Sequence, residues 1–187
     1  MKWAREIPVP VLSSLECRRI EASARGLPAY CIDRTLGQQK VPITLLPTRI
    51  IVQDDETANV SPNLFTNYQQ VVLIKRSRDF LSNPKVDRLF HALSVHHVFV
   101  IGAVTEYSVT PTVIGLLARG DRVAVVTDAC GTWSSDAGEQ AMRQMAAKGA
   151  VLVTTDELIS GAADDRLRST RPVLVPDEEE LLVAVAS

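Results

Sequence analysis

The chain has 187 residues, 46% of them hydrophobic and 22% charged, which suffices for the core of one domain. Its net charge is −2 and its arginines are interspersed with carboxylates, so nucleic-acid binding is not expected. No apolar run approaches the roughly 20 residues that cross a bilayer, and the start, MKWAREIPVPVL, lacks a signal-peptide core, which favours a cytoplasmic protein. Cys17, Cys31 and Cys130 have no CxxC spacing, which favours free thiols over a disulfide framework or a zinc site.

Continuous apolar, β-branched runs predict the strands. These runs are IPVPVL (7–12), RIIV (49–52), VVLI (71–74), VFVIG (98–102), RVAVVT (122–127), AVLVTT (150–155) and PVLV (172–175). Continuous rather than alternating apolarity is typical of strands that are buried on both faces of a parallel sheet. Helices should therefore cover both faces.

Three helices are predicted between these runs. The first begins at Pro84 and carries apolar residues at helical spacing to about residue 93. The second should span 109–119 and stop at Gly120, and the third should run from residue 135 or 136 to Gly149.

Alternating strands and helices over 98–155 predict a right-handed βαβαβ unit. The fold class is therefore α/β, a single three-layer α/β/α domain over residues 1–187 with a mostly parallel, Rossmann-like sheet. Residues 28–70, rich in Pro, Asn, Gln and Thr, predict a loop-rich excursion with at most one hairpin. The tail at 176–187 predicts a short amphipathic helix or a frayed end.

Ligands of open α/β sheets bind where the parallel strands end. The residues that follow four of the runs are Lys75, the turn 103–108, Asp128 and the segment 13–17. These four should converge on one edge of the sheet, and Asp128 is expected to cap the next loop or helix rather than act chemically.

Several segments in register resemble a known family. GAVTEYSVTPTVIGLLARGDRVAVVTDA (102–129) resembles the nucleophile segment of the isochorismatase-like cysteine hydrolases, most closely their nicotinamidase-related branch, with the approximate pattern G-V-x-T-E/D-Y-C-V. KRSRDFLSNPKVDRLF (75–90) resembles the family's lysine segment, LPAYCIDRTLGQQKVPITLLP (27–47) its P-x-H-C-x-x-G/N-T-x-G segment, and GAVLVTTDEL (149–158) its last strand. The resemblance covers about residues 5–158.

The resemblance implies a six-stranded parallel sheet and an Asp-Lys-Cys triad that hydrolyses small amides, or vinyl ethers in isochorismatase itself. It assigns Lys75 to the catalytic lysine, and Val104, Thr105, Glu106 and Tyr107 to the oxyanion site and pocket. It also implies an unusual cis peptide before the nucleophile, expected here between Val104 and Thr105.

The chain departs from this pattern at the nucleophile, where Ser108 replaces the cysteine. A hydroxyl is a poorer nucleophile than a thiol unless a base removes its proton. His91, His96 and His97 are expected to be surface residues away from the site. Lys75 is the candidate base of a Ser-Lys pair, because a desolvated lysine loses its proton more easily.

The family's aspartate lies on a first strand, in a segment of the type V-D-x-Q-x-D-F, for which this chain has no counterpart before the 7–12 run. That strand is central in the family's sheet, between the strands that resemble 7–12 and 98–102. Without it, two strand edges would be open unless they close on each other, another chain fills the gap, or the first strand is encoded upstream. We therefore expect a homo-oligomer, most simply a dimer.

Metal binding is not expected. The nicotinamidase branch binds its metal through an Asp-x-His pair and a later His, and the matching positions here hold Glu16, Arg18 and Tyr30. A guanidinium cannot coordinate a cation, and a carboxylate with a phenol makes no zinc site. No other cofactor is expected either.

The sequence thus predicts an isochorismatase-family, hydrolase-like protein whose ancestral activity is hydrolysis of a carbon–nitrogen bond in a small amide. That activity is expected to be weak or absent because of Ser108. Two alternatives stay open, namely a working serine hydrolase that uses Ser108 and Lys75, and a non-catalytic binding or assembly subunit (a pseudoenzyme). The expected partner is a small-molecule amide or a related ligand.

Overall fold

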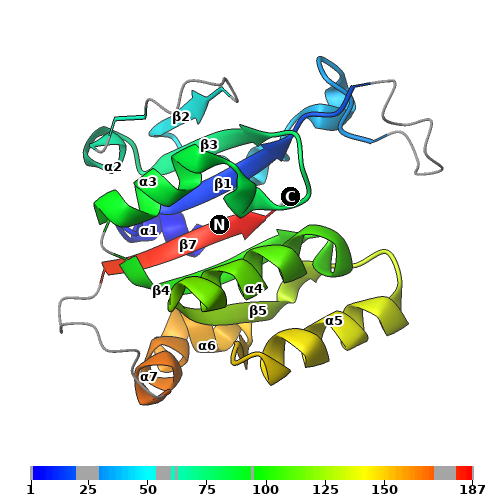
Figure 1. The fold of residues 1–187 in the computed structure, drawn as a ribbon. Helices are drawn as coiled ribbons and strands as arrows, with labels where there is room; N and C mark the ends of the chain where they lie inside the picture. The colour runs from blue at the N-terminus through cyan, green and yellow to red at the C-terminus, as the bar shows by residue number, and fades with distance from the viewer. Residues whose placement is uncertain are drawn as a thin grey trace.

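The computed structural model describes residues 2–19, 30–53, 60–61, 63–93, 95–170 and 180–186. Within this part of the chain, seven parallel strands form one sheet in the order β2-β3-β1-β7-β4-β5-β6 (Figure 1). The strands are β1 (Val11–Glu16), β2 (Arg49–Val52), β3 (Gln70–Lys75), β4 (Val95–Ala103), β5 (Arg122–Gly131), β6 (Val151–Val153) and β7 (Glu180–Ala186). The predicted parallel α/β sheet is confirmed.

Helices cover both faces of the sheet, as its apolar strands require. They are α1 (Lys2–Glu6), α2 (Leu64–Asn67), α3 (Pro84–Leu93), α4 (Thr110–Arg119), α5 (Ser135–Ala147), α6 (Thr155–Ser160) and α7 (Ala162–Ser169). The three predicted helices are confirmed as α3, α4 and α5, and Gly120 and Gly149 adopt the left-handed conformation expected of helix ends. No helix among the described residues is long and apolar enough to cross a membrane.

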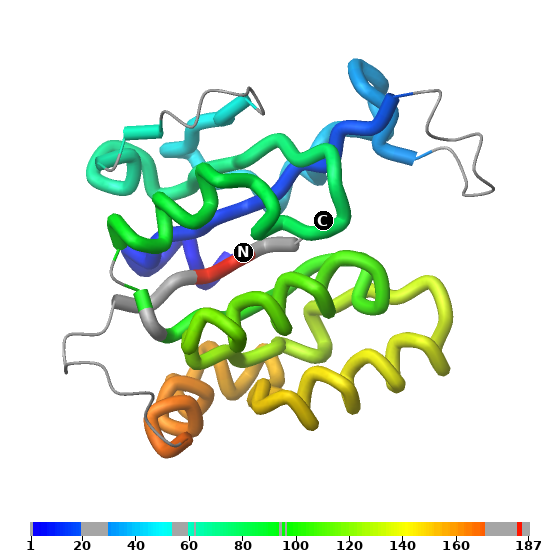
Figure 2. Tube along the Cα trace, viewed as in Figure 1, coloured from blue at the N-terminus to red at the C-terminus, as the bar shows by residue number. Residues whose placement is uncertain are grey.

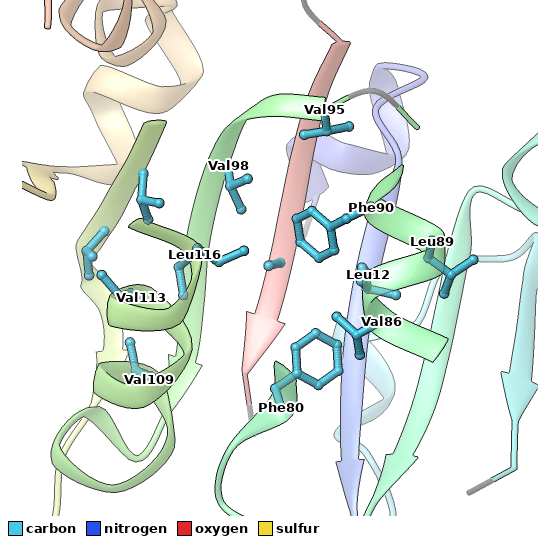
Figure 3. Close-up of a cluster of buried hydrophobic side chains, with 14 of the residues drawn as sticks. Leu12, Phe80, Val86, Leu89, Phe90, Val95, Val98, Val109, Val113 and Leu116 are labelled. Atoms are coloured by element: carbon cyan, nitrogen blue, oxygen red, sulfur yellow. The ribbon is translucent and has the colours of Figure 1, made fainter. Parts of the chain in front are cut away.

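Alternate residues along the strands build two cores. The core beneath α3, α4 and α5 is drawn in part in Figure 3, which labels Leu12, Phe80, Val86, Leu89, Phe90, Val95, Val98, Val109, Val113 and Leu116. The opposite core joins residues of α1, α6 and α7 to the other strand faces, with Val11 and Phe99 among its members. Phe80 belongs to the first core and is fully buried, which makes it a packing residue. Figures 1 and 2 show α3 and α4 in front of the sheet.

The first and last predicted strands need correction. β1 starts at Val11 rather than at residue 7, because Pro8 and Pro10 lack the N–H group that a central strand must donate. The predicted strand PVLV (172–175) lies outside the described residues.

β7 occupies the centre of the sheet. It pairs with β1 over residues 183–185 and with β4 over residues 180–186. The expectation of a short helix or a frayed end is therefore wrong for residues 180–186. The expected open edges on β1 and β4 are wrong as well, because the chain's own last strand pairs with both. The homodimer stays a prediction, but open strand edges on β1 and β4 no longer support it.

The loop-rich region forms no hairpin among its described residues. β2 pairs with β3 in parallel, and two short 3-10 turns, Leu36–Gln38 and Pro42–Thr44, precede it. The buried Gln70 amide fastens this region to the sheet. Its Oε1 accepts from Leu46 N at 2.7 Å, and its Nε2 donates to Ser13 Oγ at 2.9 Å and to Thr44 O at 3.0 Å.

His97 is buried, with 1% of its surface exposed, so the prediction of a surface residue is wrong for it. His91 is exposed, and the side chain of His96 lies outside the described part. Arg122 Nη1 lies 3.0 Å from His97 Nε2, and Asp164 Oδ1 lies 2.9 Å from its Nδ1. Because a guanidinium only donates, Nε2 accepts and the Nδ1–H donates to Asp164.

We expect Asp164→Asn to reduce stability by about 1 kcal/mol, because it weakens a hydrogen bond to a buried ring. Partial burial would raise the pKa of Asp164, but hydrogen bonds from Arg168 and His97 hold it below the ordinary value. The contribution of the Asp164 carboxylate to the free energy of unfolding is therefore present above the ordinary aspartate pKa of about 3.9. It is lost as the pH falls through the lower pKa that Asp164 has in the folded protein. Urea unfolding from pH 7 to pH 3 should show a smaller acid-dependent loss in the variant; equal losses would contradict this role.

Candidate functional site

The carboxyl ends of the parallel strands bring the predicted residues to one edge of the sheet. Lys75 ends β3, Glu16 ends β1 directly beside it in the strand register, and Ser108 lies in the turn after β4. All three side chains are buried, with 2%, 6% and 1% of their surfaces exposed. The edge predicted from the strand ends is therefore the edge at which polar side chains gather.

The turn after β4 holds Ser108 in front of α4. Its cis peptide bond joins Ala103 to Val104, so the expected position between Val104 and Thr105 is wrong by one residue. A π-helical turn, Thr105–Val109, follows, in which the N–H groups of Tyr107, Ser108 and Val109 all donate to Val104 O at 3.1, 2.8 and 3.2 Å. The Ser108 hydroxyl donates to Ala103 O at 3.2 Å.

Lys75 shares the edge with Ser108 but does not bond to it. Its Nζ donates to Arg78 O at 3.4 Å, and no hydrogen bond between Lys75 and Ser108 occurs in the described part of the chain. Burial lowers the pKa of Lys75, and the nearby Glu16 carboxylate partly opposes this shift. The ammonium therefore releases its proton more easily than that of an exposed lysine.

Glu106 fastens the turn to the loop before α5. Its carboxylate accepts from Trp133 N at 3.0 Å, from Ser134 N at 3.3 Å and from Thr132 Oγ1 at 2.7 Å. Burial would raise the pKa of Glu106, but hydrogen bonds from its own backbone N–H and from these three groups hold it below the ordinary value. Thr105 makes a second link, because its hydroxyl donates to a β5 carbonyl at 2.7 Å.

Tyr107 belongs to an aromatic cluster that its sequence position alone did not reveal. Its ring centroid lies 6.4 Å from that of Tyr30 and 5.4 Å from that of Trp133, and the Tyr30 and Trp133 centroids are 5.6 Å apart. Arg18 stacks over Tyr30 at 4.4 Å and Arg78 over Tyr107 at 5.0 Å. Two guanidinium groups thus lie against the cluster, on the same side of the molecule as the edge of the sheet.

The positions that match the family's metal ligands do not fit a metal. Arg18 Nε lies 3.8 Å from Glu16 Oε1, and the same guanidinium stacks on the Tyr30 ring. A fixed positive charge therefore stands among the three matching side chains and would repel a cation. No group of three or more His, Cys, Asp or Glu side chains suited to a metal occurs among the described residues.

A cavity of about 310 Å³ opens at this edge, with a mostly apolar wall. Its lining includes Leu15, Glu16, Cys31, Lys40, Val41 and Ala103. Lys40 Nζ donates to a β1 carbonyl at 2.8 Å, and burial, together with the charge of Lys75, lowers the pKa of Lys40 to about 8. Lys40 and Cys31 were not singled out from the sequence as site residues.

Two further predictions concern the three cysteines and Asp128. Cys17, Cys31 and Cys130 are free, as predicted, and burial raises the pKa of each thiol. Asp128 Oδ1 accepts from Thr155 N at 2.8 Å and from its hydroxyl at 2.9 Å, so its role is structural as predicted, but at the start of α6 rather than at the next helix, α5.

The fold and this edge define a parallel α/β protein with buried polar side chains and a cavity where its strands end. The chain matches the Isochorismatase domain over residues 2–157, and it therefore belongs to the isochorismatase family. No curated protein matches the chain significantly.

Solved structures share the fold at low sequence identity. An isochorismatase-like hydrolase from Alkaliphilus metalliredigens is 18% identical with a TM-score of 0.66, over 86% of this chain and 79% of that one. The pyrazinamidase of Pyrococcus horikoshii, in complex with zinc, is 18% identical with a TM-score of 0.61, over 78% and 75%. The nicotinamidase of Bacillus subtilis is 12% identical with a TM-score of 0.59, over 77% and 74%. At these identities the likeness shows the fold alone.

Proposed function

We propose that this member of the isochorismatase family binds a small amide or a related ligand and hydrolyses it weakly or not at all. The ancestral reaction is the cleavage of a carbon–nitrogen bond, in keeping with the nicotinamidase and pyrazinamidase that share the fold. A homodimer and a cytoplasmic location remain predictions from the sequence.

The observation that supports this proposal is the hydrogen bond of the Ser108 hydroxyl. A serine must lose its proton as it attacks, yet the Ser108 hydroxyl donates to Ala103 O, a carbonyl that cannot serve as a base. The central strand offers no acid near the site either, because the one carboxylate in ELLVAVA belongs to Glu180, the first residue of β7, at the other end of the strand. Of the family's three catalytic groups, the cysteine is thus replaced by Ser108, and β7, within residues 180–186, brings no aspartate to this edge.

A second candidate, a Ser108 and Lys75 hydrolase, has one observation in its favour. Lys75 is buried at the same edge and its pKa is lowered, which is the property a lysine base requires. The reaction would require Lys75 to exchange its bond to Arg78 O for one to Ser108.

The test is ammonia release from nicotinamide, pyrazinamide, benzamide and acetamide by the parent protein and by Ser108→Ala. We expect the two proteins to be equally slow, near the uncatalysed background. Turnover by the parent that disappears in both Ser108→Ala and Lys75→Met would contradict the proposal and support the serine hydrolase. A serine-directed acylating probe, read by mass spectrometry, should leave Ser108 unlabelled.

A further inference from the structure

We propose that Lys40 is a nucleophilic lysine, which forms a Schiff base with a small aromatic aldehyde in the cavity where the strands end. Lys40 lines this cavity of about 310 Å³ together with Glu16 and Cys31. The activity lies beyond the proposed function, because it requires neither Ser108 nor an amide.

The amino group of Lys40 lies among residues of the cavity wall. Its Nζ donates to Ser14 O at 2.8 Å, and Ser14 directly precedes Leu15 and Glu16, which both line the cavity. The thiol of Cys31, another residue of the wall, lies within electrostatic range of the Lys40 ammonium. The one hydrogen bond of Nζ is to a neutral carbonyl, which a neutral amine can make with one hydrogen while its lone pair stays available.

Lys40 has no carboxylate partner among the residues that the structure describes. Glu16, the acid on the cavity wall, interacts instead with Lys75 and Arg18, whose charges act on its carboxyl group. A cation in a mostly apolar cavity without a counter-ion is unfavourable, and a second cation nearby adds to the cost. The surroundings of Lys40 therefore favour its neutral amine.

The pKa of Lys40 agrees with these surroundings. Burial, together with the charge of Lys75, lowers it to about 8. At about pH 7.5 a substantial share of Lys40 is then neutral, whereas an ordinary lysine with a pKa of about 10.4 is almost entirely protonated. Lysines that react with carbonyl compounds are activated in this way, by desolvation in an apolar pocket or by an adjacent cation.

Lys75 is less suited to this reaction, although burial lowers its pKa too. Its Nζ donates to Arg78 O, and the nearby Glu16 carboxylate favours its charged form. Within the described part of the chain, the residues that line the cavity include Lys40 but not Lys75. A small molecule in the cavity therefore meets Lys40.

The reaction of Lys40 needs no further reagent. The lone pair of the amine attacks the carbonyl carbon, an N–C bond forms, and the π electrons of the C=O bond move to the oxygen. One proton passes from the nitrogen to that oxygen through solvent, which gives a carbinolamine. The carbinolamine loses its hydroxyl group and the remaining nitrogen proton as water, and a C=N bond forms. One amine and one aldehyde thus give one imine and one water, without an oxidant or a reductant.

The cavity wall selects the body of the aldehyde. Most of the wall is apolar, formed by residues such as Leu15, Ala103 and Ala129, and a volume of about 310 Å³ accommodates a single ring. Benzaldehyde fits this description, whereas the small, polar glycolaldehyde gains little from an apolar wall. Benzaldehyde should therefore react at Lys40 in preference to glycolaldehyde.

Reductive trapping tests the proposal. Benzaldehyde and sodium cyanoborohydride convert the imine into a stable benzyl-lysine, which peptide mapping by mass spectrometry locates and separates from the N-terminal amine. At about pH 7.5 we expect Lys40 to be labelled at least about tenfold faster than Lys148, an exposed lysine of the same chain. The rate at Lys40 should rise as the pH increases through about 8 and then level off. Lys40→Met should lose this label, and Lys148→Met should keep it.

Four results would overturn the proposal: no label at Lys40, equal rates at Lys40 and Lys148, labelling of Lys75 in place of Lys40, or no preference for benzaldehyde over glycolaldehyde at Lys40 relative to Lys148. All four are read on the parent protein, so the outcome does not depend on whether Lys40→Met folds. The assay contains no amide and does not involve Ser108. A failure of this proposal is therefore distinct from a failure of the proposed function.

Discussion

Val183→Asp should prevent the protein from folding. Val183 lies on β7 with 2% of its surface exposed and belongs to the core on the α1, α6 and α7 side of the sheet. An unpaired carboxylate there would cost several kcal/mol, which is comparable with the 5–15 kcal/mol that stabilises a typical domain. The effect should be severe because β7 joins two halves of the sheet, β2-β3-β1 and β4-β5-β6.

Circular dichroism during thermal unfolding measures this effect, and Ile159→Asp is the matched control. Ile159 lies on α6 with 54% of its surface exposed, so the same kind of exchange should change stability by no more than about 0.5 kcal/mol. A cooperative transition for Val183→Asp near that of the parent would mean that β7 does not occupy the centre of the sheet.

The part of the fold that could be predicted is the part that local signals determine. Over 98–155 the strands are continuous apolar runs, and the helices between them have apolar stripes and end at glycines. Each of these elements can therefore be predicted from its own residues. The order of these elements along the chain then implies their arrangement, because consecutive βαβ units are right-handed and parallel.

β7 could not be placed by the same reasoning. The run LLVAVA is apolar enough for a buried strand, but it follows the acidic segment DEEE and no helical pattern connects it to a neighbour. Its position between β1 and β4 depends on strands that lie far away in the sequence. This C-terminal run pairs with both β1 and β4, the two strands whose edges the sequence alone left without a partner.

The candidate site likewise has one part that the sequence predicts and one part that it does not. The strand ends placed Lys75 and Ser108 at one edge, because parallel strands all end on the same side. The family resemblance already placed Arg18 and Tyr30 together, at positions that match one metal site, but nothing in the sequence placed Trp133 beside Tyr30. From the sequence, Arg18 stands only for a lost metal ligand, whereas in the structure its guanidinium lies 3.8 Å from Glu16 Oε1 and over the Tyr30 ring.

Ser108→Cys should raise the turnover of small amides by at least about tenfold over the parent. A thiol is a few per cent ionised at neutral pH, and the N-terminus of α4 favours the thiolate, so the new nucleophile needs no base to begin the attack. The rate should nevertheless stay about 10²–10⁴ below that of an intact hydrolase, because no general base has been restored.

Ammonia release from nicotinamide and benzamide between pH 6 and pH 9 measures this gain, with Ser108→Ala and the parent as controls. The rate of Ser108→Cys should rise with pH as the new thiol ionises, near the ordinary cysteine pKa of about 8.5 or below it. The three native thiols should contribute nothing, because burial raises their pKa values and they are present in every variant. If the new thiol reacts with iodoacetamide while the amides stay intact, a reactive thiol alone does not restore catalysis. The role of the protein is then binding.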